Sequence, residues 1–454
     1  MHLSIPGVSI DCVKVLQAYR FTLDPNDRQR TQLASHCGAA RFAFNWGLAL
    51  VRSRLEARHG DGKTTVPWSL AELRREWNRS KSDVAPWWAE NSKEAYSSGL
   101  DALGRALKGF AAWKMGQRPG ARVGFPRFRK RRSRRESCRF TTGGIRVLDD
   151  GNHIHLPRIM VVKTHESTRK LLRLLVGGRA RILSATISRS ADRWQVAFGC
   201  EVDRACGRPA RPDDVVGVDV GVTNLAVLSS GRTIPNPRPL KRALRRLRRA
   251  CRRVSRGKLG SGRRERSARR VARIHARVRH QRTDALHKLT TALAKEYGTI
   301  VVERLHLAGI SRNRRLARAL ADSGIGQIRR QLTYKAPWYG SRVVVAHHLF
   351  PSSKTCSRCG WVKAMLSLGE RTFRCSRCGL VLDRDYNAAL NLARLAEPVG
   401  CSARQTVNAR GGERKTEASA AAAACEAGTE LPTLGRSQSR SPSARPMVAS
   451  VWEC

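Results

Sequence analysis

Hydrophobic and polar positions change their period several times along this chain, and each change predicts a different kind of element. Residues 14–23 alternate as a β-strand does, and the Asp-Pro-Asn-Asp sequence at 24–27 then supplies turn and helix-capping chemistry. From residue 28 to about 113, apolar residues recur at helical spacing. The pattern predicts a first strand within residues 1–26, followed by a small helical domain over residues 27–118.

A β-rich pattern replaces the helical one after residue 116. Short alternating stretches lie at 137–147, 153–163 and 179–203, and the last of them has the form of a hairpin. We interpret residues 119–210 as a β-rich domain that pairs with the N-terminal strand across the helical insertion.

Strands and helices alternate in the next part of the chain, residues 213–398. Two strands and a tight turn are expected between residues 215 and 228, and further strands at 299–302 and 342–346. A helix that begins near Asp385 ends this part. Such alternation indicates α/β architecture.

Few large apolar residues follow position 398. Residues 399–454 are rich in Ala, Ser, Arg, Gly and Pro, a composition that cannot support a packed core. We expect this tail to be disordered.

The charge is strongly positive, since 87 Lys and Arg residues stand against 35 acidic ones and give a formal net charge of +52. A polyanionic partner would offset this self-repulsion, and the alternatives are a solvated basic surface or attraction to a membrane surface. Between residues 238 and 282, Glu265 is the only acid. Nucleic acid is therefore the expected partner, and a basic helical hairpin over 238–296 is suited to lie along its backbone.

The first 21 residues lack a basic segment followed by an apolar core, and no stretch of the chain is apolar for long enough to span a bilayer. We therefore expect no membrane partner. The expected location is the cytoplasm, in association with the nucleoid.

Thirteen cysteines are scattered irregularly, except for four near the C-terminal end. Cys356, Cys359, Cys375 and Cys378 form two Cys-Ser-Arg-Cys-Gly units, and this spacing is that of a zinc ribbon. Four thiolates complete a closed tetrahedral site, so the zinc would be structural. The alternative reading is two redox pairs or coincidental cysteines, which the duplication of the whole unit disfavours.

Three acidic residues lie at positions where a carboxylate needs a partner or a function. Asp219 lies in an apolar strand, where an ionised side chain is costly unless it binds a metal or is otherwise paired. Glu303 ends another apolar strand, and Asp385 lies at the start of a helix. Taken singly, Glu303 could form a salt bridge with Arg304 or another of the many arginines, and Asp385 could cap its helix.

Taken together, the three acids and the cysteines between them resemble the TnpB family, also called OrfB. The family motifs read Gly-Val-Asp-Val-Gly at 217–221, Val-Val-Glu-Arg-Leu at 301–305 and Asp-Tyr-Asn-Ala-Ala at 385–389. Further similarities are Arg-Phe-Ala-Phe-Asn-Trp at 41–46, Phe-Pro-Arg-Phe at 125–128, Leu-Thr-Tyr-Lys-Ala at 332–336 and Pro-Ser-Ser-Lys-Thr at 351–355.

The resemblance covers about residues 14–396 and implies a fold. It implies an α/β RNase H-like (RuvC) nuclease domain with a zinc ribbon insertion at 354–380. It also implies an N-terminal β-barrel-like wedge domain, residues 1–26 and 119–210, interrupted by a helical recognition-like domain.

An activity is implied as well: a magnesium-dependent endodeoxyribonuclease in which Asp219, Glu303 and Asp385 hold the catalytic magnesium. Clustered carboxylates suit magnesium, because hard oxygen ligands bind it, and two ions together stabilise the attacking water and the leaving oxygen. The implied partners are a guide RNA derived from the transposon end and a target double-stranded DNA.

Two related functions stay open beside the RNA-guided endonuclease of a transposable element. One is a compact type V CRISPR effector, which would share the nuclease site and the zinc element. The other is a catalytically silent, RNA-guided DNA-binding repressor, whose mark would be the loss of one acid. All three acids are present.

Two positions depart from the family pattern. Arg304 stands where many relatives place an acid or Asn, and near Ile325 an aromatic residue would be more usual. Neither departure removes a carboxylate. The helical domain also contains aromatic residues that could stack on bases but are more often core: Trp77, Trp87, Trp88 and Trp113.

Overall fold

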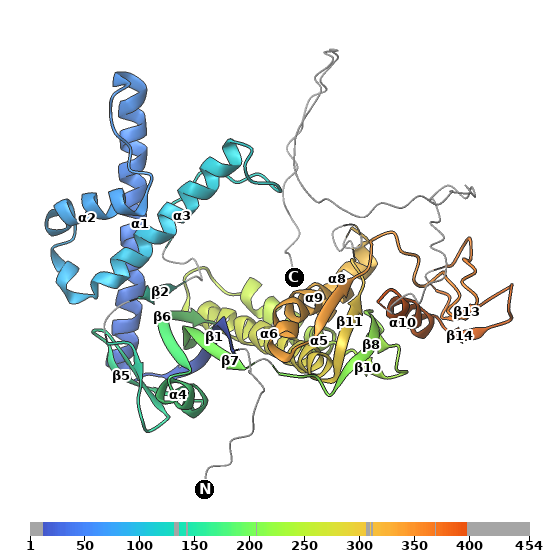
Figure 1. Ribbon diagram of the computed structural model, residues 1–454. Helices are drawn as coiled ribbons and strands as arrows, with labels where there is room; N and C mark the ends of the chain where they lie inside the picture. The colour runs from blue at the N-terminus through green and yellow to red at the C-terminus, as the bar shows by residue number, and fades with distance from the viewer. Residues whose placement is uncertain are drawn as a thin grey trace, which may run out of the picture. The chain divides into compact units, whose positions relative to one another are not determined.

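The computed structural model describes residues 12–130, 136–141, 144–205, 207–305, 309, 312–367 and 369–396 (Figure 1). The tail expected to be disordered, residues 399–454, lies outside the described residues, as do residues 1–11. No helix in the part of the chain that is described is both long and apolar enough to cross a membrane.

The first strand and the first helix form where the pattern predicts them. Strand β1 spans Cys12–Asp24 and helix α1 spans Asp27–Asp61. Asn26 caps α1, because its side chain accepts from the backbone N–H of Gln29 while the Gln29 side chain accepts from the backbone N–H of Asn26. This reciprocal capping makes the sharp change from strand to helix.

Two further helices complete the helical segment, α2 (Leu70–Val84) and α3 (Lys93–Lys114), with the short 3₁₀ helix η1 (Pro86–Glu90) between them. Helix α3 crosses α1 closely at Gly99, where a Cβ atom would lie 2.1 Å from the carbonyl oxygen of Ala40. Glycine is therefore required at this crossing.

The β-rich segment joins β1 in one sheet, with the strand order β2-β6-β7-β1-β5-β4-β3. Strand β1 pairs antiparallel with β7 from Cys12↔Ala205 to Thr22↔Gln195, so the pairing expected across the helical insertion is present. Helix α4 (Arg169–Val176) was not expected there. The bounds of the strands are β2 Ser137–Phe140, β3 Arg146–Val147, β4 His153–Leu156, β5 Met160–Thr164, β6 Ala180–Ser190 and β7 Arg193–Ala205.

The second large sheet has five strands in the order β10-β9-β8-β11-β12, which confirms the α/β expectation. Strands β8, β11 and β12 run parallel, while β9 and β10 are antiparallel to their neighbours. Their bounds are β8 Arg211–Asp219, β9 Asn224–Leu228, β10 Thr233–Pro235, β11 Tyr297–Val302 and β12 Arg342–Val345.

Helices cover this sheet and extend from it. The predicted basic hairpin is α5 (Pro239–Ser255) and α6 (Gly262–Glu296), and α6 packs Leu286, Leu289 and Leu293 into the core of the sheet. The remaining elements are α8 (Arg314–Ser323), α9 (Ile325–Lys335), the 3₁₀ helix η2 (Ala336–Tyr339), the hairpin strands β13 (Thr372–Arg374) and β14 (Val381–Asp383), and α10 (Arg384–Arg394).

Helix α9 is attached to α6 by a buried lysine. Lys335 is only 4% exposed, and no acid among the described residues forms an ion pair with it. Its Nζ donates hydrogen bonds to the carbonyl oxygen of His287 (2.9 Å) and to the hydroxyls of Thr290 (2.8 Å) and Thr291 (2.7 Å). Burial lowers the pKa of Lys335 to about 8.

This lowered pKa predicts a pH dependence of stability. The folded chain releases the proton of Lys335 near pH 8, whereas the unfolded chain keeps it until about pH 10.5. The unfolded chain therefore binds more protons in that window, and the free energy of unfolding should rise by about 1–2 kcal/mol from pH 7.5 to pH 9.5. Urea unfolding at the two pH values measures the rise in the parent and in Lys335→Met, which should lack it. An equal rise in both chains would contradict the prediction.

Candidate functional site

The three acids lie at one end of the second sheet. Asp219 is the last residue of β8, and Glu303 follows the last residue of β11. Strands β8 and β11 are parallel, and Val218 lies opposite Val302. Asp219 and Glu303, the next residue of each chain segment, therefore lie side by side. The carboxyl ends of two neighbouring parallel strands thus bring together residues that are far apart in the sequence.

The third acid, Asp385, is supplied by the first turn of α10, which packs on β8. This packing depends on Gly217, because a Cβ atom there would lie 1.9 Å from the backbone carbonyl oxygen of Ala389. The first glycine of the Gly-Val-Asp-Val-Gly motif thus allows the helix that carries Asp385 to approach the strand that carries Asp219.

Burial and mutual repulsion raise the pKa values of two of these carboxyl groups. Burial raises the pKa of Asp219 well above its ordinary value, and the charges of Glu303 and Asp385 raise it further. Burial also raises the pKa of Glu303, against the effect of the hydrogen bond that Ser352 donates to its Oε1. A cation bound among these half-buried carboxylates would offset their repulsion and stabilise their ionised forms.

The alternative structural roles of Glu303 and Asp385 are not those that the structure shows. The N-cap of α10 is Asp383, whose side chain accepts from the backbone N–H groups of Asp385 and Tyr386. Within the described residues, Glu303 forms no salt bridge with Arg304 and instead accepts from Ser352. Helix capping and a salt bridge with Arg304 therefore do not account for these two carboxylates.

Asp385 is held by two arginines. Its Oδ1 accepts from Arg384 at 3.2 Å, and its Oδ2 lies 3.8 Å from Nη1 of Arg371. Arg371 also donates to the hydroxyl of Thr223 at 3.2 Å. Reading the sequence missed these arginines, because a chain with this many arginines offers no local signal for them.

Two asparagines of α10 hold the segment that leads into the cysteine element. Asn387 accepts from the backbone N–H of Ser357 (2.9 Å) and donates to the carbonyl of Thr355 (2.7 Å). One turn later, Asn391 donates to the carbonyls of Ser352 (2.8 Å) and Thr355. The Asn of the Asp-Tyr-Asn-Ala-Ala motif thereby acquires a role: it attaches the cysteine element to α10.

The four cysteines converge as the spacing predicts. All four Sγ atoms lie within 4.8 Å of one another, and Cys356–Cys378 and Cys359–Cys375 are each 3.6 Å apart. Sulfurs around a tetrahedral zinc at 2.3 Å would be about 3.8 Å apart, so the donor set fits zinc. Among the residues with described positions, this is the one group of His, Cys, Asp and Glu side chains that gathers so closely.

The two knuckles have the same backbone geometry. In the first, Gly360 donates to the carbonyl of Cys356 at 3.0 Å, and in the second, Gly379 donates to that of Cys375 at 3.1 Å. Both glycines have positive φ, 75° and 70°, as the turn after a Cys-x-x-Cys pair requires. The repeated Cys-Ser-Arg-Cys-Gly sequence thus gives the same turn geometry in both knuckles.

The basic hairpin presents most of its cations to solvent. Leu247, Ala250 and Ile274 form its small core, and the backbone N–H groups of Leu240 and Lys241 donate to Asp322, which caps α5. The exposed cations of α5 are Lys241, Arg242, Arg245, Arg246, Arg248, Arg249, Arg252 and Arg253. A dense row of arginines with almost no acid is suited to phosphates.

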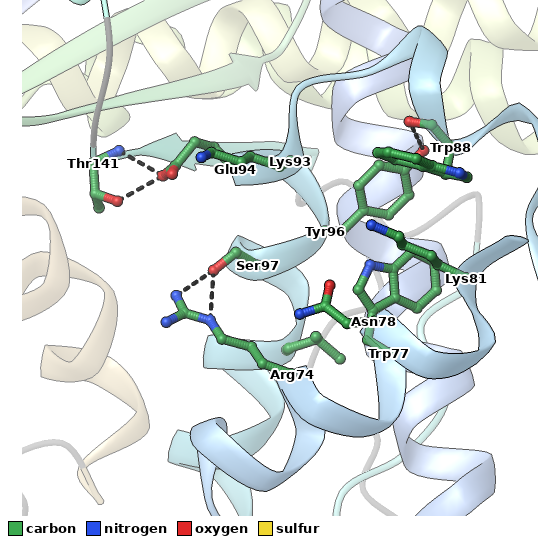
Figure 2. A pocket seen from close by; sticks show the side chains of 11 residues that line it. Arg74, Trp77, Asn78, Lys81, Trp88, Lys93, Glu94, Tyr96, Ser97 and Thr141 are labelled. Atoms are coloured by element: carbon green, nitrogen blue, oxygen red, sulfur yellow. Dashed lines mark hydrogen bonds between the residues drawn. The ribbon is translucent and has the colours of Figure 1, made fainter.

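The helical segment contains a pocket (Figure 2). Trp77 is buried and stacks on Tyr96, which agrees with a core role. Trp88 is only partly buried and lines a pocket of about 350 Å³, with the ammonium of Lys81 3.9 Å from the centre of its ring. Arg74 also lines the pocket and donates to Ser97. Aromatic rings beside cations can bind bases and phosphates.

Comparison with known proteins relates the chain to one family. Residues 197–314 match the OrfB_IS605 family, described as "Probable transposase", and residues 326–392 match the "Cas12f1-like, TNB domain". Residues 15–60 match a family described as "Helix-turn-helix domain", although here they form a strand and one continuous helix.

Curated relatives match along most of the chain. A Mycobacterium tuberculosis protein named "Putative RNA-guided DNA endonuclease" is 41% identical over 427 residues, which are 88% of this chain and 91% of the relative. A Streptomyces pristinaespiralis protein of the same name is 34% identical and covers 84% of this chain and 89% of its own. Among solved structures, a complex of Cas12f1 with sgRNA and target DNA has 13% identity and a TM-score of 0.46, covering 84% of this chain and 99% of that one.

The close approach at Gly217 predicts a loss of stability on substitution. Gly217→Ala should destabilise the fold by about 1–3 kcal/mol, because the added methyl group forces α10 away from β8. Gly60→Ala is the matched control, since nothing lies within 4 Å of a Cβ atom at that position. Denaturant unfolding compares the two variants, and equal stabilities would contradict the role given to Gly217.

The cysteine geometry predicts about one equivalent of tightly bound zinc per chain. Elemental analysis after removal of loosely bound ions measures it. Cys356→Ser should lower both the zinc content and the yield of folded protein, because the metal contributes free energy of folding. Cys251→Ser, outside the cluster, is the control, and zinc lost equally from both variants would count against the assignment.

Proposed function

This chain belongs to the OrfB family of TnpB-like proteins, and from that premise we propose that it is the RNA-guided DNA endonuclease of a transposable element. It would hydrolyse phosphodiester bonds in double-stranded DNA selected by a guide RNA. The observation that carries the proposal is the cluster of Asp219, Glu303 and Asp385 at the carboxyl ends of β8 and β11 and the start of α10. Burial and mutual repulsion raise the pKa values of Asp219 and Glu303.

The strand order β10-β9-β8-β11-β12, with its parallel and antiparallel pairs, supports an RNase H-like (RuvC) domain with the cysteine element inserted before α10. The sheet built from β1 and β7 would be the wedge domain. The helical segment α1–α3, inserted between those two strands, would be the recognition domain.

Asp219, Glu303 and Asp385 would hold magnesium, for which carboxylate oxygens are suitable ligands. Magnesium bound there supplies positive charge against the phosphate that reacts. The chain's own residues set the geometry: Ser352 orients Glu303, while Arg371 and Arg384 fix Asp385. Half-burial keeps bulk water from screening these charges.

Zinc in the cysteine element would be structural. Four thiolates fill a tetrahedral zinc site and leave no position for a substrate. The element is tied to α10 through Asn387 and Asn391, so zinc would stabilise the segment that contains Ser352 and, through it, the position of Glu303.

The RNA would be the guide that comes from the transposon end, and the DNA would be the matched target. Exposed arginines of α5 and α6 are suited to sugar-phosphate backbones, since each phosphate neutralised releases counterions. The pocket around Trp88, Lys81 and Arg74 offers a further contact for nucleic acid. The net charge of +52 agrees with so large a polyanionic partner.

Removal of one carboxylate tests the nuclease site. Asp219→Ala, purified with its co-expressed RNA and incubated with matched DNA and magnesium, should lose cutting by at least about a thousandfold, because a ligand of the metal is gone. Binding of RNA and DNA should stay unchanged in a filter or gel assay.

Asp213→Ala is the control, since Asp213 is an exposed acid on the same strand. Cutting by Asp219→Ala at the rate of Asp213→Ala would refute the assignment of the site. Guide-dependent binding without cutting by the parent chain would indicate the RNA-guided repressor instead.

A further inference from the structure

A small pocket adjoins the acid cluster and has no role in the chemistry described so far. Its volume is about 80 Å³, and Glu303 lines one side of it. The other lining residues are five with aliphatic side chains, one glycine and one arginine: Val220, Val302, Leu305, Ile325, Ile328, Gly326 and Arg329. Val220 follows Asp219 directly in the chain, so the pocket adjoins the end of β8 as well as Glu303.

The size of the pocket limits what it can receive. Sites for whole small molecules measure roughly 300–1,000 Å³, and a volume of about 80 Å³ is far smaller. It can accept one group of a larger ligand. Because it opens beside the acid cluster, that larger ligand is the substrate of the cluster.

The lining specifies an apolar group. Ile325, Ile328 and Val302 are 6%, 1% and 2% exposed, so they form a rigid aliphatic floor. Among the groups that DNA bases present at their edges, the 5-methyl group of thymine is apolar, whereas the others are hydrogen-bond donors and acceptors. Aliphatic side chains at this place therefore favour thymine.

The rim carries a cation suited to the phosphate of the same nucleotide. Arg329 is exposed on α9, and no hydrogen bond or ion pair of its guanidinium occurs within the described residues. It does not pair with Glu303, although both line the pocket. Guanidinium groups bind phosphate in a bidentate manner, and a phosphate is the anion that a nuclease must bring next to its acids.

We propose that this pocket, formed by Ile325, Ile328 and the aliphatic residues at the ends of β8 and β11, receives the 5-methyl group of a thymine in one nucleotide beside the bond that is cut. Arg329 binds the phosphate of that nucleotide. The inference rests on the proposed nuclease function and adds a sequence preference at the cut, separate from the pairing with guide RNA.

Ile325 decides whether the pocket exists. It lines the pocket, and an aromatic ring in its place would fill a volume of about 80 Å³. The smaller side chain leaves the pocket open in this chain. Ile325→Trp therefore removes the pocket and leaves the acids in place.

Photochemical cross-linking tests the pocket without relying on cutting. The Asp219→Ala chain with its RNA is bound to matched DNA that carries 5-iododeoxyuridine at one position at a time, since iodine replaces the methyl group. We expect one position in the cut region to cross-link to the peptide that contains residues 325–329, and Ile325→Trp to lose at least about nine-tenths of that product. Cross-links that persist in Ile325→Trp, or that form only with other elements, overturn the proposal.

Cutting rates provide the second readout. Replacement of thymine by deoxyuridine at the cross-linked position should slow cutting about fourfold, the factor that burial of one methyl group supplies. Arg329→Ala should slow it about tenfold, as expected for one charge-assisted contact. Arg330→Ala, the neighbouring exposed arginine on α9 that does not line the pocket, is the matched control.

The two proposals fail separately. If the parent chain never cuts matched DNA, the nuclease function is wrong, and a cross-link to residues 325–329 still reports whether the 5-substituent of a base enters the pocket. If the parent cuts but Arg329→Ala behaves as Arg330→Ala and deoxyuridine has no effect, the pocket proposal alone is wrong. Val176→Trp, an exposed site in α4, controls for adding a large side chain.

Discussion

The close packing of α10 against β8 at Gly217 is the contact on which the rest of the candidate site depends. At this point the backbone of a helix lies directly on the backbone of a strand, and only a residue without a Cβ atom leaves room for it. The contact sets the distance between Asp385 on the helix and Asp219 on the strand. It also places Asn387 and Asn391 where they can reach the segment before and within the first cysteine knuckle.

From that helix, a path of hydrogen bonds leads to Glu303. Asn391 holds the carbonyl of Ser352, and the hydroxyl of Ser352 donates to Glu303. The cysteine element is attached to the same segment through Asn387. The cysteine cluster and the acid cluster therefore share one short piece of chain, which lies between Glu303 and Asp385 in the sequence.

Charge is distributed very unevenly over the molecule. The hairpin of α5 and α6 is covered by exposed arginines, whereas the end of the second sheet concentrates three carboxylates in a half-buried place. Arg371 and Arg384 contact Asp385, one of these carboxylates. A polyanion is attracted by the cations and repelled by the acids unless a cation binds among them.

Local patterns determined several features of this protein by themselves. Alternation over residues 14–23 and the capping side chains at 24–27 predicted β1 and the start of α1, because strand pleating and helix capping depend on neighbours in the sequence. The two Cys-Ser-Arg-Cys-Gly units predicted a metal site, because each knuckle is a local turn. The family motifs contain the three acids, Asp219, Glu303 and Asp385.

Only the tertiary structure decided how these pieces meet. The register of β8 and β11 brings Glu303 next to Asp219, and Asp383 rather than Asp385 caps α10. Ser352 and Arg371 reach the acids across long stretches of chain, and Arg329 with Ile325 forms a pocket beside them. Contacts of this kind arise from packing between elements, which depends on shape and volume and leaves no periodic trace in the order of residues.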